Sequence, residues 1–305
     1  MPLPPGPLPD PRWTSAADWL AAGTGGREPD LAVLGVPAHA SSMTGSGAHK
    51  TPAAVRQALH GLSTWAGARK IELSTLAALD LGNVDDPDLA DEGEWRVRIA
   101  AESGATLARL VAFVGGDNSF VAAAAGGVLG DVAAGGLVIL DVRHDVRDGR
   151  GNASAVRRLL TAGMPGERIV QIGLADWADS RSYADEAYAR GIHPIQRGEV
   201  ADRGIADCMG EALDLAGAGR RPVFVALDLD VCDRAVAPGC RGALPGGLSA
   251  RDVLTAAYIA GAAPMVRAVA ITEVDATADP TGGTVKLAAM CLLETAAGLA
   301  RRPVD

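Results

Sequence analysis

The chain has 305 residues, 48% of them hydrophobic, so it can bury a large core, and we expect one domain over residues 1–305. Its formal net charge is −9 and its positive charges are scattered, which argues against a nucleic-acid partner. No apolar run reaches the roughly 18 residues of a membrane span, and no charged segment precedes an apolar core at the N-terminus. We therefore expect a cytoplasmic protein without a membrane partner. Its four cysteines lack C-x-x-C spacing and are expected to be reduced.

Strand and helix patterns alternate along almost the whole chain after an irregular lead-in over about residues 1–30 that has room for one short helix. Strands are expected at 31–37, from 111, from 136, 169–173, around 192, from 222 and at 266–274. Helices are expected from 51, at 94–110, from 119, and at 153–162, 184–190, 204–216, 249–262 and 284–300. This alternation predicts an α/β fold, a three-layer α/β/α sandwich with a mostly parallel central sheet.

Charged residues follow directly after one apolar strand. The run Gly136–Leu140 suits a strand that is buried on both faces, and open parallel sheets bind ligands where such strands end. Because a strand repeats every two residues, Asp141, Arg143 and Asp145 should point one way. The same alternation points His144 the other way.

A second apolar strand, from Pro222 to Leu227, is followed by Asp228 and Asp230, which should also share a face. Carboxylates from two neighbouring strand ends would lie close together, and they cannot all stay ionised without a cation. Hard oxygen ligands suit Mg²⁺, Ca²⁺ or Mn²⁺, so the sequence indicates a divalent or binuclear metal site. For any single aspartate, capping of the next helix is the alternative interpretation.

Two further segments lie where the sheet should present its ligand site. The turn Gly115–Ser119 joins a strand to a helix, which places Asn118 at that end, although Asp, Asn or Ser can equally cap a helix there. The loop over residues 237–249 is long for a compact domain, and long ordered loops tend to be functional.

Five motifs, in the family's order, resemble the ureohydrolases: arginase, agmatinase and formimidoylglutamase. They are Gly35-Val36-Pro37; Gly115-Gly116-Asp117; Asp141 to Asp145; Asp228-x-Asp230 with Ala237-Pro238-Gly239 and Gly246-Gly247-Leu248-Ser249; and Glu273-Val274-Asp275. Within the family, residues 145–147, 152–159 and 231–234 look most like formimidoylglutamases of actinobacterial type. The resemblance implies an arginase-like fold and a homo-oligomer.

The resemblance also implies a site with two manganese ions bridged by a hydroxide that attacks a guanidine or amidine carbon. The family's ligands are four aspartates and two histidines. The aspartates match Asp141, Asp145, Asp228 and Asp230, whereas the two histidine positions hold Asn118 and Arg143.

The two replacements differ in consequence. The carbonyl of Asn118 can still bind a hard ion, whereas Arg143 has no lone pair and adds a positive charge. His144 could supply a ligand only through a local bulge, and Arg143 could instead pair with the aspartates in place of one metal. We therefore expect one or two Mn²⁺ ions.

The first functional hypothesis is a formimidoylglutamase-like enzyme, which hydrolyses N-formimidoyl-L-glutamate to glutamate and formamide in histidine degradation. By resemblance, Asp145 would orient the hydroxide and move its proton, and Glu273 would hold the amidinium. Asn152, Ser154 and Arg157 would bind the carboxylate end of the substrate, although capping or a solvated surface position would also explain these three.

Two alternatives remain open. One is a metal-poor, catalytically impaired homologue with a binding or assembly role, which would explain Asn118 and Arg143 directly. The other is a guanidino-acid hydrolase of arginase or agmatinase type. The four aspartates, Glu273 and the Gly-rich loops favour an enzyme, since a purely structural role would not require them.

Overall fold

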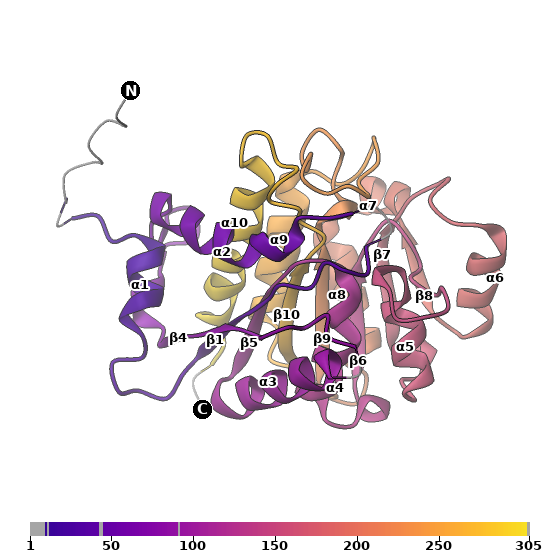
Figure 1. The fold of residues 1–305 in the computed structure, drawn as a ribbon, viewed down its shortest axis with the longest axis horizontal. Helices are drawn as coiled ribbons and strands as arrows, with labels where there is room; N and C mark the ends of the chain where they lie inside the picture. Colours follow the sequence, from indigo (N-terminus) through magenta and orange to yellow (C-terminus); the bar gives the residue numbers. More distant parts are fainter. Residues whose placement is uncertain (1–9, 11, 43–44, 91, 304–305) are drawn as a thin grey trace.

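The computed structural model describes residues 10, 12–42, 45–90 and 92–303. A sheet of eight parallel strands runs through its centre in the spatial order β4-β1-β5-β10-β9-β6-β7-β8 (Figure 1). The strands are β1 (Leu31–Val36), β4 (Ala78–Asn83), β5 (Leu110–Gly115), β6 (Gly136–Leu140), β7 (Ile169–Leu174), β8 (His193–Gln196), β9 (Val223–Asp228) and β10 (Val266–Thr272). A separate antiparallel pair is formed by β2 (Trp65–Ala66) and β3 (Ile71–Glu72).

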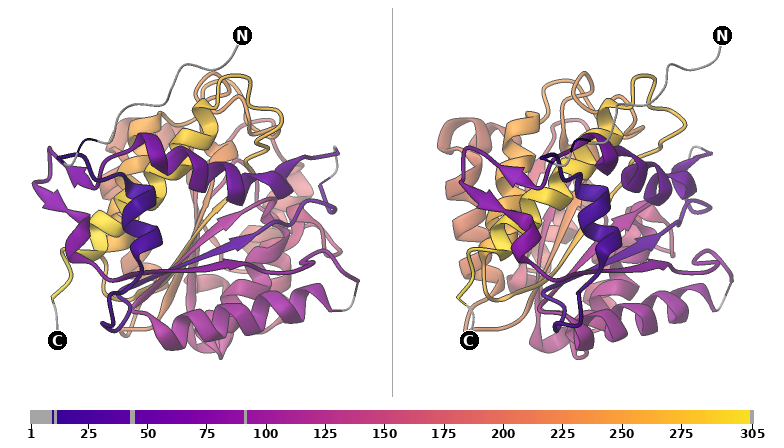
Figure 2. Two further views of the ribbon diagram at one scale, coloured as in Figure 1. Left: turned by 60° about the vertical axis from the view of Figure 1, so that its left-hand side comes forward. Right: turned by 90° about the vertical axis from the view of Figure 1, so that its left-hand side faces the viewer.

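Helices cover both faces of the sheet. One buried cluster unites one face with α1 (Ala16–Ala22), α2 (Thr51–Ala58), α7 (Arg197–Arg203), α8 (Ile205–Ala216), α9 (Ala250–Ala262) and α10 (Gly283–Leu299). A second cluster unites the other face with α3 (Gly93–Leu107), α4 (Val121–Leu129), α5 (Ala155–Thr161) and α6 (Arg181–Ala189). Figure 2 shows the sheet between these layers, with α3 on the opposite side from α1, α2 and α10. The predicted three-layer α/β/α sandwich is confirmed. None of the described helices combines the length and apolar character that a membrane crossing requires.

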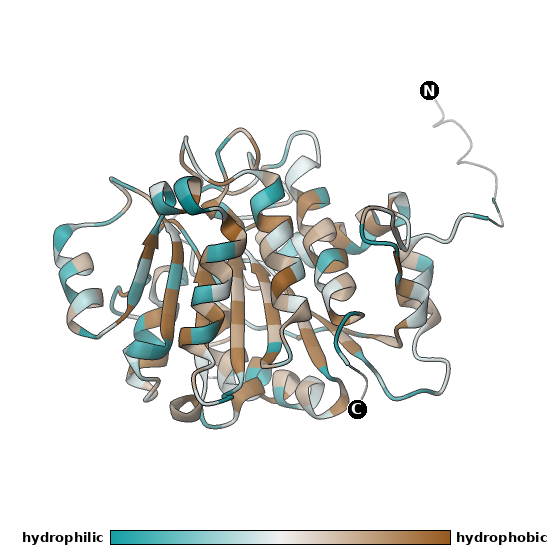
Figure 3. Ribbon diagram, turned by 180° about the vertical axis from the view of Figure 1, so that it is seen from behind, coloured by the Kyte–Doolittle hydropathy of each residue, from teal (hydrophilic) through white to brown (hydrophobic). Residues whose placement is uncertain are grey.

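The central strands are apolar on both faces. In β9, Val223, Val225 and Leu227 belong to one buried cluster, and Phe224 and Ala226 belong to the other. Figure 3 shows the strands as the hydrophobic centre of the molecule. Burial on both faces explains why these strands are continuous apolar runs in the sequence, and it leaves only the strand ends for polar side chains.

Three strands and one helix were missing from the sequence prediction. The edge strand β4 pairs only with β1, and its Asp80 accepts hydrogen bonds from Arg56, so it lacks the apolar run of a central strand. The small β2–β3 pair is too short to give a pattern. Helix α7 precedes α8, and Gly204, at a φ of 85°, separates them. The four cysteines are free and buried.

The strand order brings distant segments together. Strands β5, β10, β9 and β6 are consecutive in the sheet, so their carboxyl ends meet at one edge. The loops that follow β9 (orange) and β10 (yellow) rise at the upper side of Figure 1. This is the edge at which the sequence predicts the functional site.

Backbone hydrogen bonds at Gly116 and Asp117 connect the turn after β5 to the chain segments that follow β1 and β10. The N–H of Gly116 donates to the carbonyl of Val36 (2.9 Å), and the N–H of Asp117 donates to the carbonyl of Ala38 (2.8 Å). The carbonyl of Gly116 accepts from the N–H of Glu273 (2.8 Å). A Cβ atom at Gly116 would lie 1.8 Å from the Ala38 oxygen, so the close approach requires glycine.

We predict that Gly116→Ala lowers the free energy of unfolding by roughly 1–3 kcal/mol, the usual cost of overpacking. The matched control is Gly210→Ala in α8, where an added Cβ would meet nothing within 4 Å. It should raise the free energy of unfolding by up to about 1 kcal/mol, because alanine is the better helix former. Urea denaturation of both variants measures the difference, and equal effects would contradict the packing argument.

Candidate functional site

Three buried aspartates at the ends of β6 and β9 form the centre of the site. Asp141, Asp228 and Asp230 bring oxygen atoms within 4.8 Å of one another. Backbone groups orient them: the N–H of Arg143 donates to Asp141 Oδ1 (2.7 Å), and the N–H of Asp230 donates to Asp228 Oδ1 (3.0 Å). The predicted convergence of carboxyl groups from two strand ends is confirmed for these three.

Asp145 lies beside Asn118, from the turn after β5. Asn118 Nδ2 donates to Asp145 Oδ2 at 2.6 Å, and both side chains are buried. Asp145 has a φ of 51°, in the left-handed region, a conformation that costs a residue with a side chain on the order of 1–3 kcal/mol. This turn directs the fourth aspartate toward the cavity that the other three line.

Glu273 follows β10 and also has a positive φ, 63°. Its Oε1 accepts hydrogen bonds from the backbone N–H of Asn118 (2.8 Å) and from Asn152 Nδ2 (3.1 Å). Burial, followed by the charges of Asp117 and Asp230, raises the pKa of Glu273 to about 8. The sequence-predicted residues Asn118, Asn152 and Glu273 are thus joined by hydrogen bonds.

Arg143 faces the aspartates. Its Nη1 lies 2.9 Å from Asp230 Oδ2. Burial opposes the charge of Arg143, but the surrounding aspartates, Asp230 first, outweigh burial and hold its pKa above the usual range. Gly242 lies against this pair, since a Cβ there would be 2.2 Å from Asp230 Oδ2.

His144 is turned away from the aspartates. Its N–H donates to Asp179 Oδ2 (2.6 Å), and its Nδ1 lies 2.7 Å from Gln171 Oε1. Gln171 Nε2 in turn donates to the His144 carbonyl (2.9 Å). β6 ends at Leu140 and the chain bends at Val142 and Arg143, so the loop and not strand alternation sets where these side chains point. The contacts of His144 with Asp179 and Gln171 nevertheless hold it away from the aspartates, as the sequence predicts.

The charges of the clustered aspartates favour binding of a cation. Burial, and next the charges of neighbouring carboxylates, raise the pKa of Asp141, Asp145 and Asp228 well above its usual value. Burial also raises the pKa of Asp230, although Arg143 opposes this shift. These carboxylates cannot all ionise together unless positive charge is added.

The donor set fits a hard divalent ion. Asp141 Oδ2 and Asn118 Oδ1 are buried oxygen atoms without a hydrogen-bond partner among the described residues. Unsatisfied buried oxygens are costly, and carboxylate and amide oxygens are the ligands that Mn²⁺ and Mg²⁺ prefer. The residues present therefore suit such a cation.

A cavity of about 340 Å³ opens beside the cluster. Besides the four aspartates, Arg143 and Glu273, its lining includes Ser42, Asn152, Arg234 and Arg241. No role was predicted from the sequence for Ser42, Arg234 or Arg241. The length of the loop over 237–249 was the signal for Arg241, whose Nε donates to Asp275 Oδ2 at 2.9 Å.

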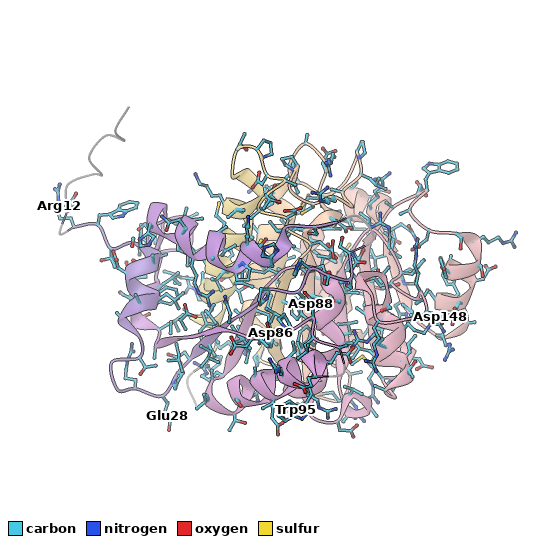
Figure 4. All side chains as sticks on the ribbon, viewed as in Figure 1. Arg12, Glu28, Asp86, Asp88, Trp95 and Asp148 are labelled. Atoms are coloured by element: carbon cyan, nitrogen blue, oxygen red, sulfur yellow. The ribbon has the colours of Figure 1, made fainter. Side chains whose placement is uncertain are left out.

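The structure places Arg157 and Ser154 outside the lining of this cavity. Arg157 pairs with Glu186 through Nη1 and Nη2, and it lines a separate cavity with Trp95 and Asp148, which Figure 4 labels. Ser154 is buried and donates to the Gly151 carbonyl (2.6 Å). Arg157 lies in the first turn of α5, and its side chain contacts the Val146 carbonyl and Glu186.

The fold and the acidic cluster define a three-layer α/β protein with a candidate cation site where its central strands end. The chain belongs to the arginase family, whose sequence model matches residues 29–298. It is 29% identical over 300 residues to the formimidoylglutamase of Halalkalibacterium halodurans, covering 94% of this chain and 92% of that protein.

Solved structures agree with this assignment. The crystal structure of formimidoylglutamase from Bacillus subtilis matches with a TM-score of 0.90 and 26% identity, over 98% of this chain and 96% of that one. Trypanosoma cruzi formiminoglutamase with Mn²⁺ matches with a TM-score of 0.85 and 23% identity, over 95% and 100% of the two chains. The ureohydrolase resemblance and the arginase-like fold are confirmed.

The raised pKa of Glu273 predicts a pH dependence of stability. Without metal, the folded protein should keep Glu273 protonated up to about pH 8, whereas the unfolded chain releases this proton near its ordinary value of 4.5. The contribution of Glu273 to stability is therefore fully present at low pH. It is lost as pH rises between these two values, by up to about 1.4 kcal/mol per pH unit.

Glu273→Gln is the matched variant, because it keeps an acceptor for Asn118 and Asn152 but cannot ionise. In the presence of a chelator, the difference in unfolding free energy between the variant and the native protein should grow in favour of the variant from pH 5 to pH 8. Urea denaturation at a series of pH values measures this difference. A constant difference would contradict the assignment.

Proposed function

We propose that this protein is a metal-dependent hydrolase of a linear amidine, with N-formimidoyl-L-glutamate as its substrate and glutamate and formamide as its products. The observation that carries the proposal is a single cavity that combines a buried aspartate cluster with Glu273 and with arginines at its rim. Similarity to formimidoylglutamases over almost the whole chain supports the choice of substrate.

Asp141, Asp145, Asp228 and Asp230, with Asn118, are the residues that would hold the metal. The Mn²⁺ named with the T. cruzi structure supports manganese as the ion. When bound, this ion would lower the pKa of water toward neutrality and polarise the amidine.

Glu273 is placed to bind the reacting group. A carboxylate at the cavity wall can accept hydrogen bonds from an amidinium, and the bonds from Asn118 and Asn152 fix its orientation. Asp145, held by Asn118, would take a proton from the attacking water. As water adds to the amidine carbon and the bond to the glutamate nitrogen breaks, this proton would pass to that nitrogen.

The carboxylates of the substrate require positive charge at the opposite end of the cavity. Arg241 has a side chain that is 43% exposed, and the pair with Asp275 anchors it. Arg234 donates to the Cys240 carbonyl (2.5 Å), which anchors its side chain to the loop that carries Arg241. Guanidinium groups match carboxylates in shape and charge, and we assign this role to Arg241 and Arg234, with Asn152 beside them.

We predict that N-formimidoyl-L-glutamate is hydrolysed in preference to agmatine, which lacks a carboxylate. Arg241→Ala should lower kcat/KM for formimidoylglutamate roughly 10- to 100-fold, as expected for loss of a charged hydrogen bond, and leave kcat/KM for agmatine unchanged. Steady-state kinetics with both substrates and with arginine test this, and arginine also examines the guanidino-acid alternative. Equal turnover of agmatine would count against a carboxylate-bearing substrate.

Arg157→Ala tests whether Arg157 binds the substrate, as the resemblance implies, or only pairs with Glu186. The arginine pairs with Glu186 at a partly buried position, so its loss should lower the free energy of unfolding by roughly 1–3 kcal/mol. The kcat/KM of this variant for formimidoylglutamate should match that of the native protein. A selective rise in KM would restore Arg157 to the substrate site.

A metal-poor homologue with only a binding role is the less favoured alternative. The ion pair between Arg143 and Asp230 is the observation that supports this alternative. Against it, the remaining aspartates, Glu273 and the cavity keep the groups that the proposed hydrolysis needs. Turnover of formimidoylglutamate by the purified protein decides between the two.

A further inference from the structure

We propose that the guanidinium of Arg143 takes the place of a second metal ion, so that this site binds one divalent cation and not two. The proposal rests on the proposed function only for the identity of the ion, manganese. The number of ions bound can be measured without any substrate.

Arg143 spans the two groups of aspartates. Its backbone N–H donates to Asp141 Oδ1 (2.7 Å) after β6, and its Nη1 lies 2.9 Å from Asp230 Oδ2 after β9. The guanidinium itself pairs with Asp230, and its charge also interacts favourably with Asp141. A positive charge held there interacts favourably with Asp228 and Asp145 as well.

The oxygen atoms of the cluster differ in their contacts. Both oxygens of Asp230 are engaged, since Oδ2 pairs with Arg143 and Oδ1 accepts a long hydrogen bond from the N–H of Val142 (3.5 Å). Asp141 Oδ2 and Asn118 Oδ1, in contrast, are buried and have no hydrogen-bond partner among the described residues. One ion among the carboxylates on the Asn118 side would satisfy them, whereas a second ion at Asp230 would have to displace Arg143.

Packing holds Arg143 in this position. A Cβ at Gly242 would lie 3.0 Å from Arg143 Nη1 and 2.2 Å from Asp230 Oδ2, so the loop lies directly against the ion pair. A guanidinium does not lose its proton in proteins, and two like charges a few ångströms apart in a partly buried site repel strongly. A second cation would therefore meet a fixed positive charge.

The neighbouring imidazole of His144 does not replace the lost ligand. His144 is held on the other side of the chain by Gln171 and Asp179. Recruiting it would break the contacts with both residues. The ligand position is thus occupied by a charge that cannot coordinate a metal.

The test is the manganese content of the native protein and of Arg143 variants. After equilibrium dialysis against saturating MnCl₂, the native protein should hold one Mn²⁺ per chain, with the electron paramagnetic resonance spectrum of an isolated ion. Arg143→His removes the charge and supplies a ligand, so it should hold two ions with the spectrum of an exchange-coupled pair. Combining it with Asn118→His should tighten binding further, by roughly 10-fold or more.

Two control variants make the result specific. Arg143→Lys keeps the charge and should still hold one ion, and His144→Asn should leave the native stoichiometry unchanged. Far-ultraviolet circular dichroism checks that each variant is folded, and the native protein and the lysine variant test the proposal even if the histidine variant misfolds.

Two tightly bound, coupled ions in the native protein, or none at saturating manganese, would overturn the proposal. One ion in both the native protein and Arg143→His would show that Arg143 is not what excludes the second ion, and would overturn it as well. One ion in a native protein that fails to hydrolyse formimidoylglutamate would remove the proposed substrate and leave this inference standing.

Discussion

Mutual repulsion among buried carboxylates is the constraint on which the site depends. Asp141, Asp145, Asp228 and Asp230 lie around one cavity, and burial alone disfavours the charge of each. The surrounding structure offsets part of this cost with backbone N–H donors and with Arg143. The rest remains as raised pKa values and as unpartnered oxygens, which are features of a site that is organised to receive positive charge.

The fold accounts for where this charge can be concentrated. Strands that are apolar on both faces leave only their ends for polar groups, and the order β5-β10-β9-β6 sets four such ends side by side. Two of the side chains then need backbone conformations that residues with side chains seldom adopt, at Asp145 and Glu273. Strain of this kind persists only when neighbouring contacts fix it, and Gly116 supplies one by accepting the N–H of Glu273.

The parts of the site that follow strand periodicity could be predicted from the sequence. Asp141 and Asp228 stand at the ends of apolar runs, which are local signals. The predicted facing of Arg143 toward the aspartates holds, although this residue lies in the loop beyond the end of β6. The position of Arg157 could not be predicted in this way, because it depends on where α5 begins after the loop. A shift of one residue in that start rotates the helix by about 100°. Arg241 reaches the cavity through a pair with Asp275, 34 residues away, and no local pattern records a contact of that kind.

Replacing a metal ligand by arginine changes what the position contributes. A bound ion adds both charge and open coordination positions, whereas a guanidinium adds charge and directed hydrogen bonds only. The pair with Asp230 joins two charged groups of the protein itself. Asp141 Oδ2 and Asn118 Oδ1, by contrast, have no hydrogen-bond partner among the described residues, and a bound ion would satisfy them. The Asp230 side of the site can therefore act electrostatically, and an ion held on the Asn118 side would supply the Lewis-acid chemistry.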